Sequence, residues 1–552
     1  MIAQTLFRLP ALSSRVRKFV LRVFAGLFIV ALFLGGVQLR RWIGDTTRHV
    51  RYQHDIVNSF YWGNETLKEA RRLSPDKATA NSWPGFFRGY LGLYDRVKDE
   101  AYEDDYGLDY PPLRLLIMAI WTKQVRDEFP LVDSEHPKLV NPLLKINLVC
   151  ELVSAAAIFF LVRSCVRRSI RAHSSWPSWL SHEQHASICG LAAASVAWLE
   201  PSMILDAHGW PQWDVWILPF YLFAALAAFN DRWVWCGCLL AAGAMLKGQL
   251  LFVAPLFLLW PLWQKRWAGA LCVLVGFIAT WAVIVSPWLL RTRVAWLAVA
   301  ATAGVSLFLV LRYKLPYRGV WFAGIVGCAA FVIGAFTGGS FTWFEIGFLY
   351  GTKHYPYLFI SSCYNLPSLL ADAGWSLEDD LLSAHVESLH FHLTLQWALR
   401  LFYLGAVVLC ARGAVQHLRN RDARVLIAIA APWLLMFGLL GQMHERYLVW
   451  GAVVSAVALG VSVRLSIIHF ILSAASTAMI VHVMLIDKKL DATLRAIDVL
   501  EGVRPYASGL VLACIAVYFW HAIGVRIAAL QRGIPQTATR PALSLEPEPE
   551  EA

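Results

Sequence analysis

The stretch Tyr106-Gly-Leu-Asp-Tyr-Pro-Pro-Leu113 fixes a helix start within the first polar part of the chain. Two consecutive prolines set φ and remove two backbone donors, so a helix can begin here but cannot pass through. The apolar run that follows, 115–121, is far shorter than the roughly 20 residues that a membrane span needs. We therefore expect a short helix over about 112–125 at the membrane face, with Asp109 and Tyr110 at its mouth.

The composition is that of a membrane protein. The 552 residues are 58% hydrophobic and 16% charged, with a mean hydropathy of +0.52. Soluble domains carry about 25% charged residues, so a soluble fold is excluded. The net charge of +11 does not indicate nucleic acid, because the basic residues are scattered in short loops between apolar runs. The partner that this pattern indicates is the lipid bilayer.

Apolar segments recur along the chain, and we expect an all-α polytopic membrane protein with about 13–14 transmembrane helices and a long first external loop that contains short helices, one of them starting near Asp55. The first segment follows a basic N-terminus and lacks a small-residue cleavage site, which indicates a retained anchor. The expected spans lie at about 19–38, 146–164, 188–206, 213–230, 233–249, 250–264, 268–290, 294–311, 319–337, 393–411, 424–441, 447–465, 467–486 and 507–528.

These segments divide the chain into parts of different character. The stretch 39–145 is polar except for the helix after Pro112, and it is too long for a simple connector, which indicates a functional loop. In order, we expect a cytoplasmic N-terminus and first span (1–38), a first external loop (39–145), a transmembrane module (146–290), an extra hairpin (291–345), a second external loop (346–392), a C-terminal transmembrane module (393–528) and a disordered cytoplasmic tail (529–552).

Arginine and lysine far outnumber acids in the short segments 163–187 and 412–424, which would share a side with the N-terminus. Positive residues gather on the cytoplasmic side of membrane proteins. In this orientation Asp55, Asp109, Asp214, Lys247 and the segment 444–446 all face the non-cytoplasmic side.

Polar clusters lie where apolar segments end. They are Asp206 to Asp214, which includes Gln212, then Lys247-Gly-Gln249, then Gln442-Met-His-Glu-Arg-Tyr447. Charged groups at membrane depth are costly unless they find partners or line a polar cavity. A capped helix start, a Trp-rich surface turn or a snorkelling lysine would explain each cluster singly. Together they indicate one site.

The clusters resemble motifs of the GT-C superfamily of polytopic glycosyltransferases. The dolichyl-phosphate-glucose-dependent glucosyltransferases have D-x6-W-x3-T in the first external loop, and Asp55, Trp62 and Thr66 match it. The same group has G-L-D-Y-P-P-L, which this chain repeats at 107–113.

Bacterial relatives of the second mannosyltransferase of GPI-anchor assembly share the remaining motifs. Their N-P-x-x-I-L is similar to the segment 200–205, and their W-G-Q-x-D is similar to 210–214, with Pro211 where Gly is usual. Their K-x-Q matches 247–249, and their M-H-E-R-Y-L matches 443–448. The motifs occur in the same order and cover about 45–450.

The resemblance implies a GT-C fold and a hexosyltransferase that moves mannose or glucose from a polyprenyl-phosphate donor to a lipid- or glycan-linked acceptor hydroxyl. The family transfers with inversion, using a carboxylate base. A divalent metal is compatible with this resemblance but not implied by it, since no D-x-D lies at a matched position, and no cofactor is implied. The implied site residues are Asp55 and Asp109 as candidate catalytic bases, Lys247, His444 and Arg446 at the donor phosphate, and Tyr110, Gln212, Asp214, Gln249 and Glu445 at the substrate.

The resemblance to the bacterial group favours a bacterial inner membrane with a periplasm-facing site, and an endoplasmic reticulum membrane is the alternative. A transporter or flippase of lipid-linked sugars is the alternative function, because charged residues inside the membrane and broken helices suit transport as well.

Overall fold

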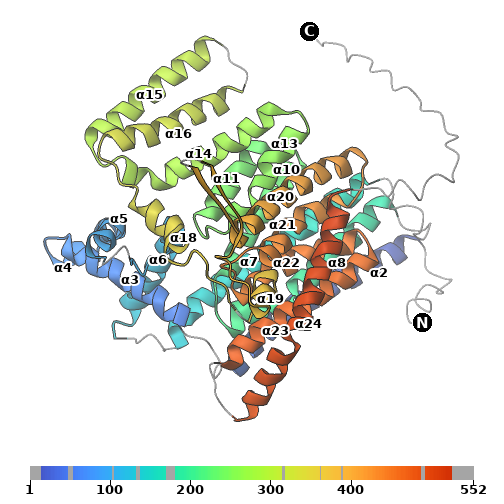
Figure 1. Ribbon diagram of the computed structural model, residues 1–552. Coiled ribbons are helices and arrows are strands. Elements are labelled where there is room, and N and C mark those ends of the chain that lie inside the picture. Colours follow the sequence, from blue (N-terminus) through green and yellow to red (C-terminus); the bar gives the residue numbers. More distant parts are fainter. Residues whose placement is uncertain are drawn as a thin grey trace, which may run out of the picture.

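Helices make up most of the computed structural model (Figure 1), which describes residues 14–47, 54–101, 105–131, 137–169, 181–313, 317–360, 362–386, 389–486 and 491–524. Within these residues eight helices are long and apolar enough to cross a membrane. The expected all-α, multi-pass membrane architecture is therefore confirmed. The eight are α2 (Ser14–Thr46), α7 (Pro137–Arg168), α14 (Trp267–Leu289), α15 (Arg293–Arg312), α16 (Arg318–Phe336), α20 (Leu395–Arg419), α23 (Val463–Ile486) and α24 (Asp491–Ala522).

The predicted number of complete spans is wrong, because several apolar segments break into pieces. One pair of helices has the length and composition of a ninth span only when taken together, because it is bent by 41°, and the other apolar helices of the described residues are short. The 13 residues of α10, for example, reach only about 20 Å, against the 30 Å of a bilayer core. The bent pair is α8 (His182–Trp198) with α9 (Pro201–Ile204) and its π-helical end η3 (Leu205–Gly209); the short helices are α10 (Ile217–Phe229), α11 (Trp233–Ala244), α12 (Leu250–Val253), α13 (Pro255–Trp263), α21 (Val425–Leu439) and α22 (Leu448–Ser455), with the 3-10 segment η7 (Ala456–Gly460) after α22.

The segment between α2 and α7, expected to be an external loop with short helices, does contain short helices. Two amphipathic helices precede Pro112, and Asp55 lies in the first turn of one of them, as expected. The expected helix itself does begin at Pro112. Gly89 lets two of these helices touch, since a Cβ there would lie 2.4 Å from the Thr66 carbonyl oxygen. The helices are α3 (His54–Arg72), α4 (Lys77–Asn81), α5 (Trp83–Glu100) and α6 (Pro112–Glu128).

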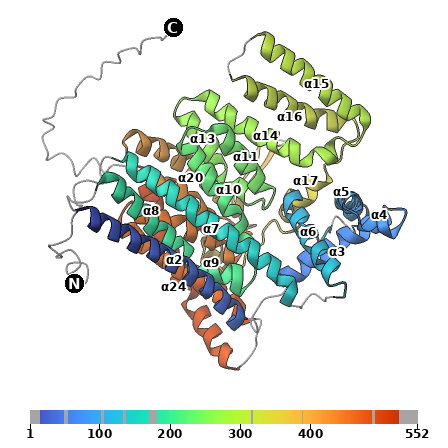
Figure 2. The same ribbon diagram turned by 180° about the vertical axis from the view of Figure 1, so that it is seen from behind.

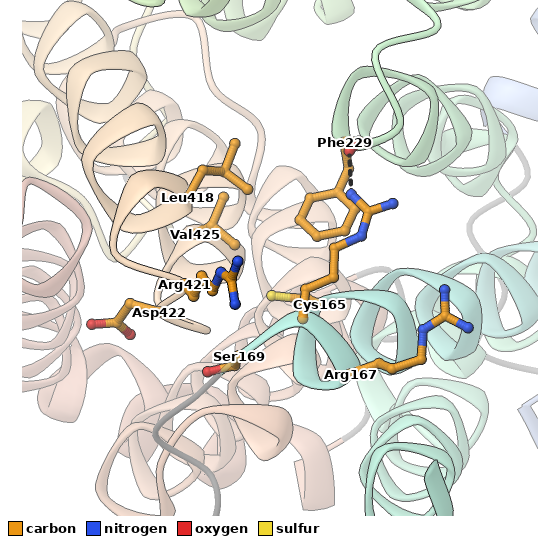
Figure 3. A pocket seen from close by; sticks show the side chains of 9 residues that line it. Cys165, Arg167, Ser169, Phe229, Leu418, Arg421, Asp422 and Val425 are labelled. Atoms are coloured by element: carbon orange, nitrogen blue, oxygen red, sulfur yellow. Dashed lines mark hydrogen bonds between the residues drawn. The ribbon is translucent and has the colours of Figure 1, made fainter. Parts of the chain in front are cut away.

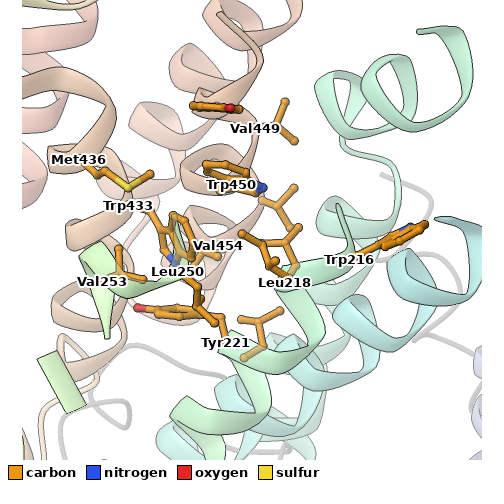
Figure 4. Packing of buried hydrophobic residues seen from close by; sticks show 14 of the residues in the cluster. Trp216, Leu218, Tyr221, Leu250, Val253, Trp433, Met436, Val449, Trp450 and Val454 are labelled. Carbon is orange, nitrogen blue, oxygen red and sulfur yellow. The ribbon is translucent and has the colours of Figure 1, made fainter. Parts of the chain in front are cut away.

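The core lies around α21, in which every residue is buried. Rings from neighbouring helices pack on it: Trp433 of α21 lies 5.1 Å from Tyr221 of α10 and 5.2 Å from Trp450 of α22, measured between ring centroids (Figure 4). The Tyr221 hydroxyl donates to the Ile429 carbonyl at 2.5 Å. Short helices that could not span alone are therefore held inside the bundle.

The helices α15 and α16 form a hairpin that projects from the edge of the bundle, opposite α2 (Figure 2). Much of the surface of α15 is apolar and exposed, which suits a lipid-facing position. Small residues bring α16 onto α14, since a Cβ at Gly327 would lie 3.2 Å from the Cα of Ala279.

The segment expected to form the second external loop holds short elements. One is an antiparallel hairpin, which the all-α expectation did not include. The predicted tail at 529–552 and the first 13 residues lie outside the described residues. The elements are α17 (Thr342–Phe344), the π-helical η5 (Glu345–Leu349), α18 (Tyr350–His354), α19 (Leu366–Asp372), β1 (Asp380–Val386) and β2 (Leu389–Thr394).

Candidate active site

Segments far apart in the sequence meet at Arg446. Its NH1 nitrogen lies 3.3 Å from Oδ2 of Asp55, and its Nε lies 2.9 Å from Oδ2 of Asp214. The Lys247 ammonium group pairs with the other oxygen of Asp214. With Arg114, described below, these residues form what we call the charged cluster: Asp55, Arg114, Asp214, Lys247 and Arg446.

Each member of the pairs at Arg446 lies at the start of a helix or at a break between helices. Asp55 is in the first turn of α3, where the helix dipole favours a carboxylate. Asp214 opens the 3-10 segment η4 (Asp214–Trp216), Lys247 lies between α11 and α12, and Arg446 belongs to the 3-10 segment η6 (Glu445–Tyr447) before α22. Non-helical backbone at membrane depth is tolerated where it is buried in protein or lines a cavity. The broken helices therefore bring these charges together.

Asn147 of α7 holds the turn that carries Gln212 and Asp214. Its amide nitrogen donates to the carbonyl oxygens of Ala207 at 2.8 Å and Gln212 at 2.7 Å. Its amide oxygen accepts from the Trp216 indole at 2.7 Å. Sequence reasoning missed Asn147, which lies in an apolar span with no motif around it.

Aromatic faces surround the cations. The Lys247 nitrogen lies 4.5 Å from the ring centroid of Tyr447 and 5.0 Å from that of Trp450, and these two rings are stacked. The Arg446 guanidinium lies 5.4 Å from the Trp210 ring. Such contacts stabilise a cation in a water-poor site. The Trp450 indole also donates to the Asp214 backbone carbonyl at 2.8 Å, which helps to fix Asp214.

Arg114 is a further cation that sequence reasoning missed. Its guanidinium lies 3.9 Å from the Tyr110 ring and 4.5 Å from the Trp213 ring. It helps to lower the pKa of Asp55. The signal in the sequence is its place directly after the Pro-Pro-Leu motif, in a first helical turn where the dipole disfavours a cation. A cation at this position must be stabilised by groups outside its own helix.

The two candidate bases lie in different surroundings. Burial raises the pKa of Asp55. The positive charges of Arg446 and Arg114 act in the opposite direction and outweigh burial, so the net pKa lies below the usual value for an aspartate. Asp55 is thus a carboxylate at neutral pH. Asp109 is exposed and has no ion pair among the described residues. Its neighbour Tyr110 is buried, which raises the Tyr110 pKa to about 12, and its hydroxyl lies 3.4 Å from that of Ser59.

The other predicted residues lie beside the charged cluster. Gln249 Nε2 is 3.5 Å from the Tyr447 hydroxyl. Glu445 is buried, next to Arg446 in the chain. Gln212 lies near Asp55 but without the geometry of a hydrogen bond. Burial, then repulsion by Arg446 and Lys247, lowers the His444 pKa to about 3, so His444 is neutral at pH 7 and differs from the predicted cation.

Several polar atoms in this region are buried without a hydrogen-bond partner from the described part of the chain. A buried polar group left in this state costs about 1–3 kcal/mol. The arrangement therefore suits a polar ligand that offers both donors and acceptors. The atoms that also lack an ion pair are both carboxylate oxygens of Asp206, both side-chain polar atoms of Gln212, and Arg114 Nε.

The sequence matches no protein-family model and no curated protein. The case for a function therefore depends on the geometry of the charged cluster and on the motifs that meet there.

Proposed function

We propose that the protein is a GT-C-type membrane glycosyltransferase that transfers mannose or glucose from a polyprenyl-phosphate donor to an acceptor hydroxyl. The observation that carries this proposal is the position of Arg446 between Asp55 and Asp214, with Lys247 on the far side of Asp214. A carboxylate base and phosphate-binding cations then occupy one buried site. The three motifs that contribute them, those of Asp55, Lys247 and Arg446, are ones that the resemblance assigns to the base and the donor phosphate.

In the proposed reaction the acceptor oxygen attacks the anomeric carbon as Asp55 takes the hydroxyl proton. A new carbon–oxygen bond forms, and the bond from the anomeric carbon to the phosphate oxygen breaks. The leaving group changes from a phosphate diester to a monoester, so negative charge grows on it. Arg446 and Lys247 stabilise that growing charge more than the ground state, and neutral His444 donates a hydrogen bond to it.

Arg446 also couples donor binding to the base. In the unliganded protein Asp55 lies 3.3 Å from the guanidinium, and a carboxylate with a lowered pKa is a weak base. Donor phosphate bound at Arg446 replaces one of its two anions. Asp55 then loses its strongest stabilising charge and becomes more basic when the sugar is in place.

A flippase for lipid-linked sugars is the second candidate. The breaks at α8–α9, α11–α12 and α21–α22 place charges between half-helices, as many transporters do. A flippase needs no base, however, and the Asp55 carboxylate beside a phosphate-binding arginine is the feature that favours transfer.

The test uses purified protein with radiolabelled polyprenyl-phosphate mannose or glucose, and octyl glycosides as acceptors. Release of polyprenyl phosphate with formation of a labelled glycoside supports the enzyme. The matched control is Asp99→Asn, an exposed carboxylate of the same external loop, which should leave turnover unchanged. Movement of intact donor across proteoliposome membranes without bond cleavage would replace the enzyme by the flippase.

A further inference from the structure

We infer that a groove between the starts of α11, α14 and α16 binds one anionic phospholipid from the surrounding bilayer. The groove lies away from the charged cluster. It begins where α11 begins, and Lys247 lies beyond the other end of that 12-residue helix, about 18 Å away along the axis. The inference is independent of the proposed function, because none of its residues belongs to the charged cluster.

The groove is built from turns of one pattern. In each turn a residue with left-handed backbone precedes a basic residue, and a helix starts at that basic residue or directly after it. Two of the turns also share a tryptophan after the arginine. The turns are Asp231-Arg232-Trp233 (φ 57° at Asp231), Lys265-Arg266-Trp267 (φ 62° at Lys265) and Tyr317-Arg318 (φ 56° at Tyr317).

Positive charge at the groove exceeds what its one carboxylate neutralises. Asp231 pairs with Arg266 at 2.7 Å and so joins two of the turns. Arg232, Lys265 and Arg318 make no side-chain hydrogen bond or ion pair with any described residue. The starts of three helices add partial positive charge, which makes these cations unfavourable for the helices themselves. An anion in the groove would relieve that repulsion.

The shape of the groove distinguishes a lipid from a free anion. The basic part is a cavity of about 710 Å³ that also exposes Trp235 and Trp267. It continues, through shared lining residues, into a second cavity of about 410 Å³. Arg318 lines this cavity at the start of α16, and the rest of its lining is mostly apolar, with small side chains such as Ala279 and Ala323. Tryptophans of this kind lie at headgroup level, and basic pockets between spans bind anionic headgroups. An acyl chain would occupy the apolar part.

A second basic cavity, of about 420 Å³, provides a comparison for the groove (Figure 3). There Arg168 already donates to the Phe229 carbonyl at 3.0 Å and to Asn230 at 2.8 Å. Asp422 is bound by Arg424 at 2.7 Å. Arg167 and Arg421 also line this cavity, but its lining includes no tryptophan, which the groove has.

The experiment measures phospholipid retained by the full-length protein after extraction from vesicles of equimolar phosphatidylglycerol and phosphatidylcholine, by native mass spectrometry. The wild type should retain phosphatidylglycerol in preference. In the variant R232Q/K265Q/R318Q the ratio of retained phosphatidylglycerol to phosphatidylcholine should fall about tenfold or more, because each cation contributes to headgroup binding. The matched control R412Q/R419Q/R464Q removes the same charge from exposed arginines elsewhere and should keep the preference.

Two further arms separate lipid from free anion and protect against a folding defect. Ala323→Phe fills the apolar part and should lower phosphatidylglycerol retention while all cations remain. Soluble glycerol 1-phosphate at millimolar concentration should not displace the lipid. Equal retention of both lipids by the wild type, equal loss in the groove and control variants, unchanged retention in Ala323→Phe, or ready displacement by glycerol 1-phosphate would each overturn the inference.

Discussion

Two groups of buried charge lie within the protein, and they differ in what their arginines contact. In the first, Arg40 of α2 pairs with Glu151 of α7 at 2.5 Å and donates to the carbonyls of Gly36 at 2.9 Å and Trp198 at 2.7 Å. His208 adds a contact to Glu151 at 3.0 Å. In the charged cluster, Arg446 has two ion pairs but no side-chain hydrogen bond with the described residues.

The difference separates a structural role from a binding role. A buried ion pair repays its desolvation only when its remaining donors and acceptors are satisfied. The donors of Arg40 are satisfied by backbone carbonyls, although Glu151 Oε1 has no hydrogen-bond partner among the described residues, and the group ties α2 to α7 and to the end of α8. Arg446 does not meet that condition within the protein, and a ligand phosphate would supply what is missing. Loss of stability should therefore follow changes at Arg40, and loss of turnover should follow changes in the charged cluster.

The largest expected effect is on turnover in Asp55→Asn. Removing a catalytic base costs about 10²–10⁴-fold in rate, and donor binding should persist because Arg446 and Lys247 remain. Turnover and donor affinity are measured separately with labelled donor, and Asp109→Asn is made alongside. An Asp55→Asn protein that keeps more than about a tenth of wild-type turnover lies outside this range and would make Asp109 the candidate base.

The next effect is on stability at Arg40. Arg40→Met leaves Glu151 buried without its main partner, which should cost about 3–5 kcal/mol, measured as the loss of thermal stability in detergent. The double variant Arg40→Met/Glu151→Leu should recover most of that loss, because an apolar pair replaces a buried ion pair well.

The matched pair in the charged cluster should behave differently. Lys247→Met/Asp214→Leu should also recover stability relative to Lys247→Met, yet it should stay inactive. Activity in that double variant would remove the distinction between the two groups.

A smaller effect is expected at Arg446. Arg446→Ala removes a group that can hold a phosphate by two parallel hydrogen bonds, and donor use should fall by at least an order of magnitude, about 1.4 kcal/mol. The measured quantity is kcat/KM for the donor. The conservative control Arg446→Lys should recover part of the lost kcat/KM. If Arg446→Ala leaves both donor affinity and turnover unchanged, Arg446 lies outside the phosphate site.

The coupling between Arg446 and Asp55 should appear in the pH dependence. The Asp55 pKa is lowered in the free protein, and phosphate at Arg446 would cancel part of that shift. Activity is lost as the base is protonated, so kcat should fall at a higher pH than kcat/KM as pH decreases, by about one unit or 1.4 kcal/mol. Coincident acid limbs for the two parameters would mean that donor binding does not release Asp55.

Much of the fold followed from the sequence because apolar runs and Pro-Pro are strong local signals. The helix start at Pro112 and the end of an apolar segment at Lys247-Gly-Gln249 were predicted from residue types alone. The number of complete spans was not predicted correctly. A 12-residue helix such as α11 is stabilised by burial against other helices, and the local sequence does not show which apolar segments will be buried in this way. Short helices before Pro112 were expected, one of them starting near Asp55, but the bounds of α5 were not, because its charged face resembles a loop sequence.

Part of the candidate site could also be predicted, because polar residues within an apolar sequence are strong local signals. Polar residues at the ends of apolar segments identified Asp214, Lys247 and Arg446, which the structure brings together. Asn147 was missed because one polar residue inside an apolar run carries no local information about the turn it supports. The neutral state of His444 also depends on its burial among cations, which only the folded arrangement shows.

The smallest expected effect concerns an exposed pair that joins α5 to the π-helical segment η5. The ammonium group of Lys98 lies 2.5 Å from the Glu345 carboxylate. This contact, together with smaller contributions from Lys353 and Tyr106, lowers the Glu345 pKa to about 2, although partial burial acts in the opposite direction. A lowered carboxylate pKa stabilises the fold above the unfolded value near 4.3, and that stability is lost as pH falls from there towards 2. The side chains are 41% and 24% exposed, so solvent screens the pair.

Lys98→Ala should therefore change the free energy of unfolding by less than about 1 kcal/mol at pH 7, and by less still at pH 3. Thermal unfolding at both pH values and at low and high salt measures this, with the exposed Lys77→Ala as the matched control. A loss as large as that of Arg40→Met would show that exposure does not separate weak from strong pairs here. It would also mean that the contact between α5 and η5 contributes as much to the fold as a buried pair inside the bundle does.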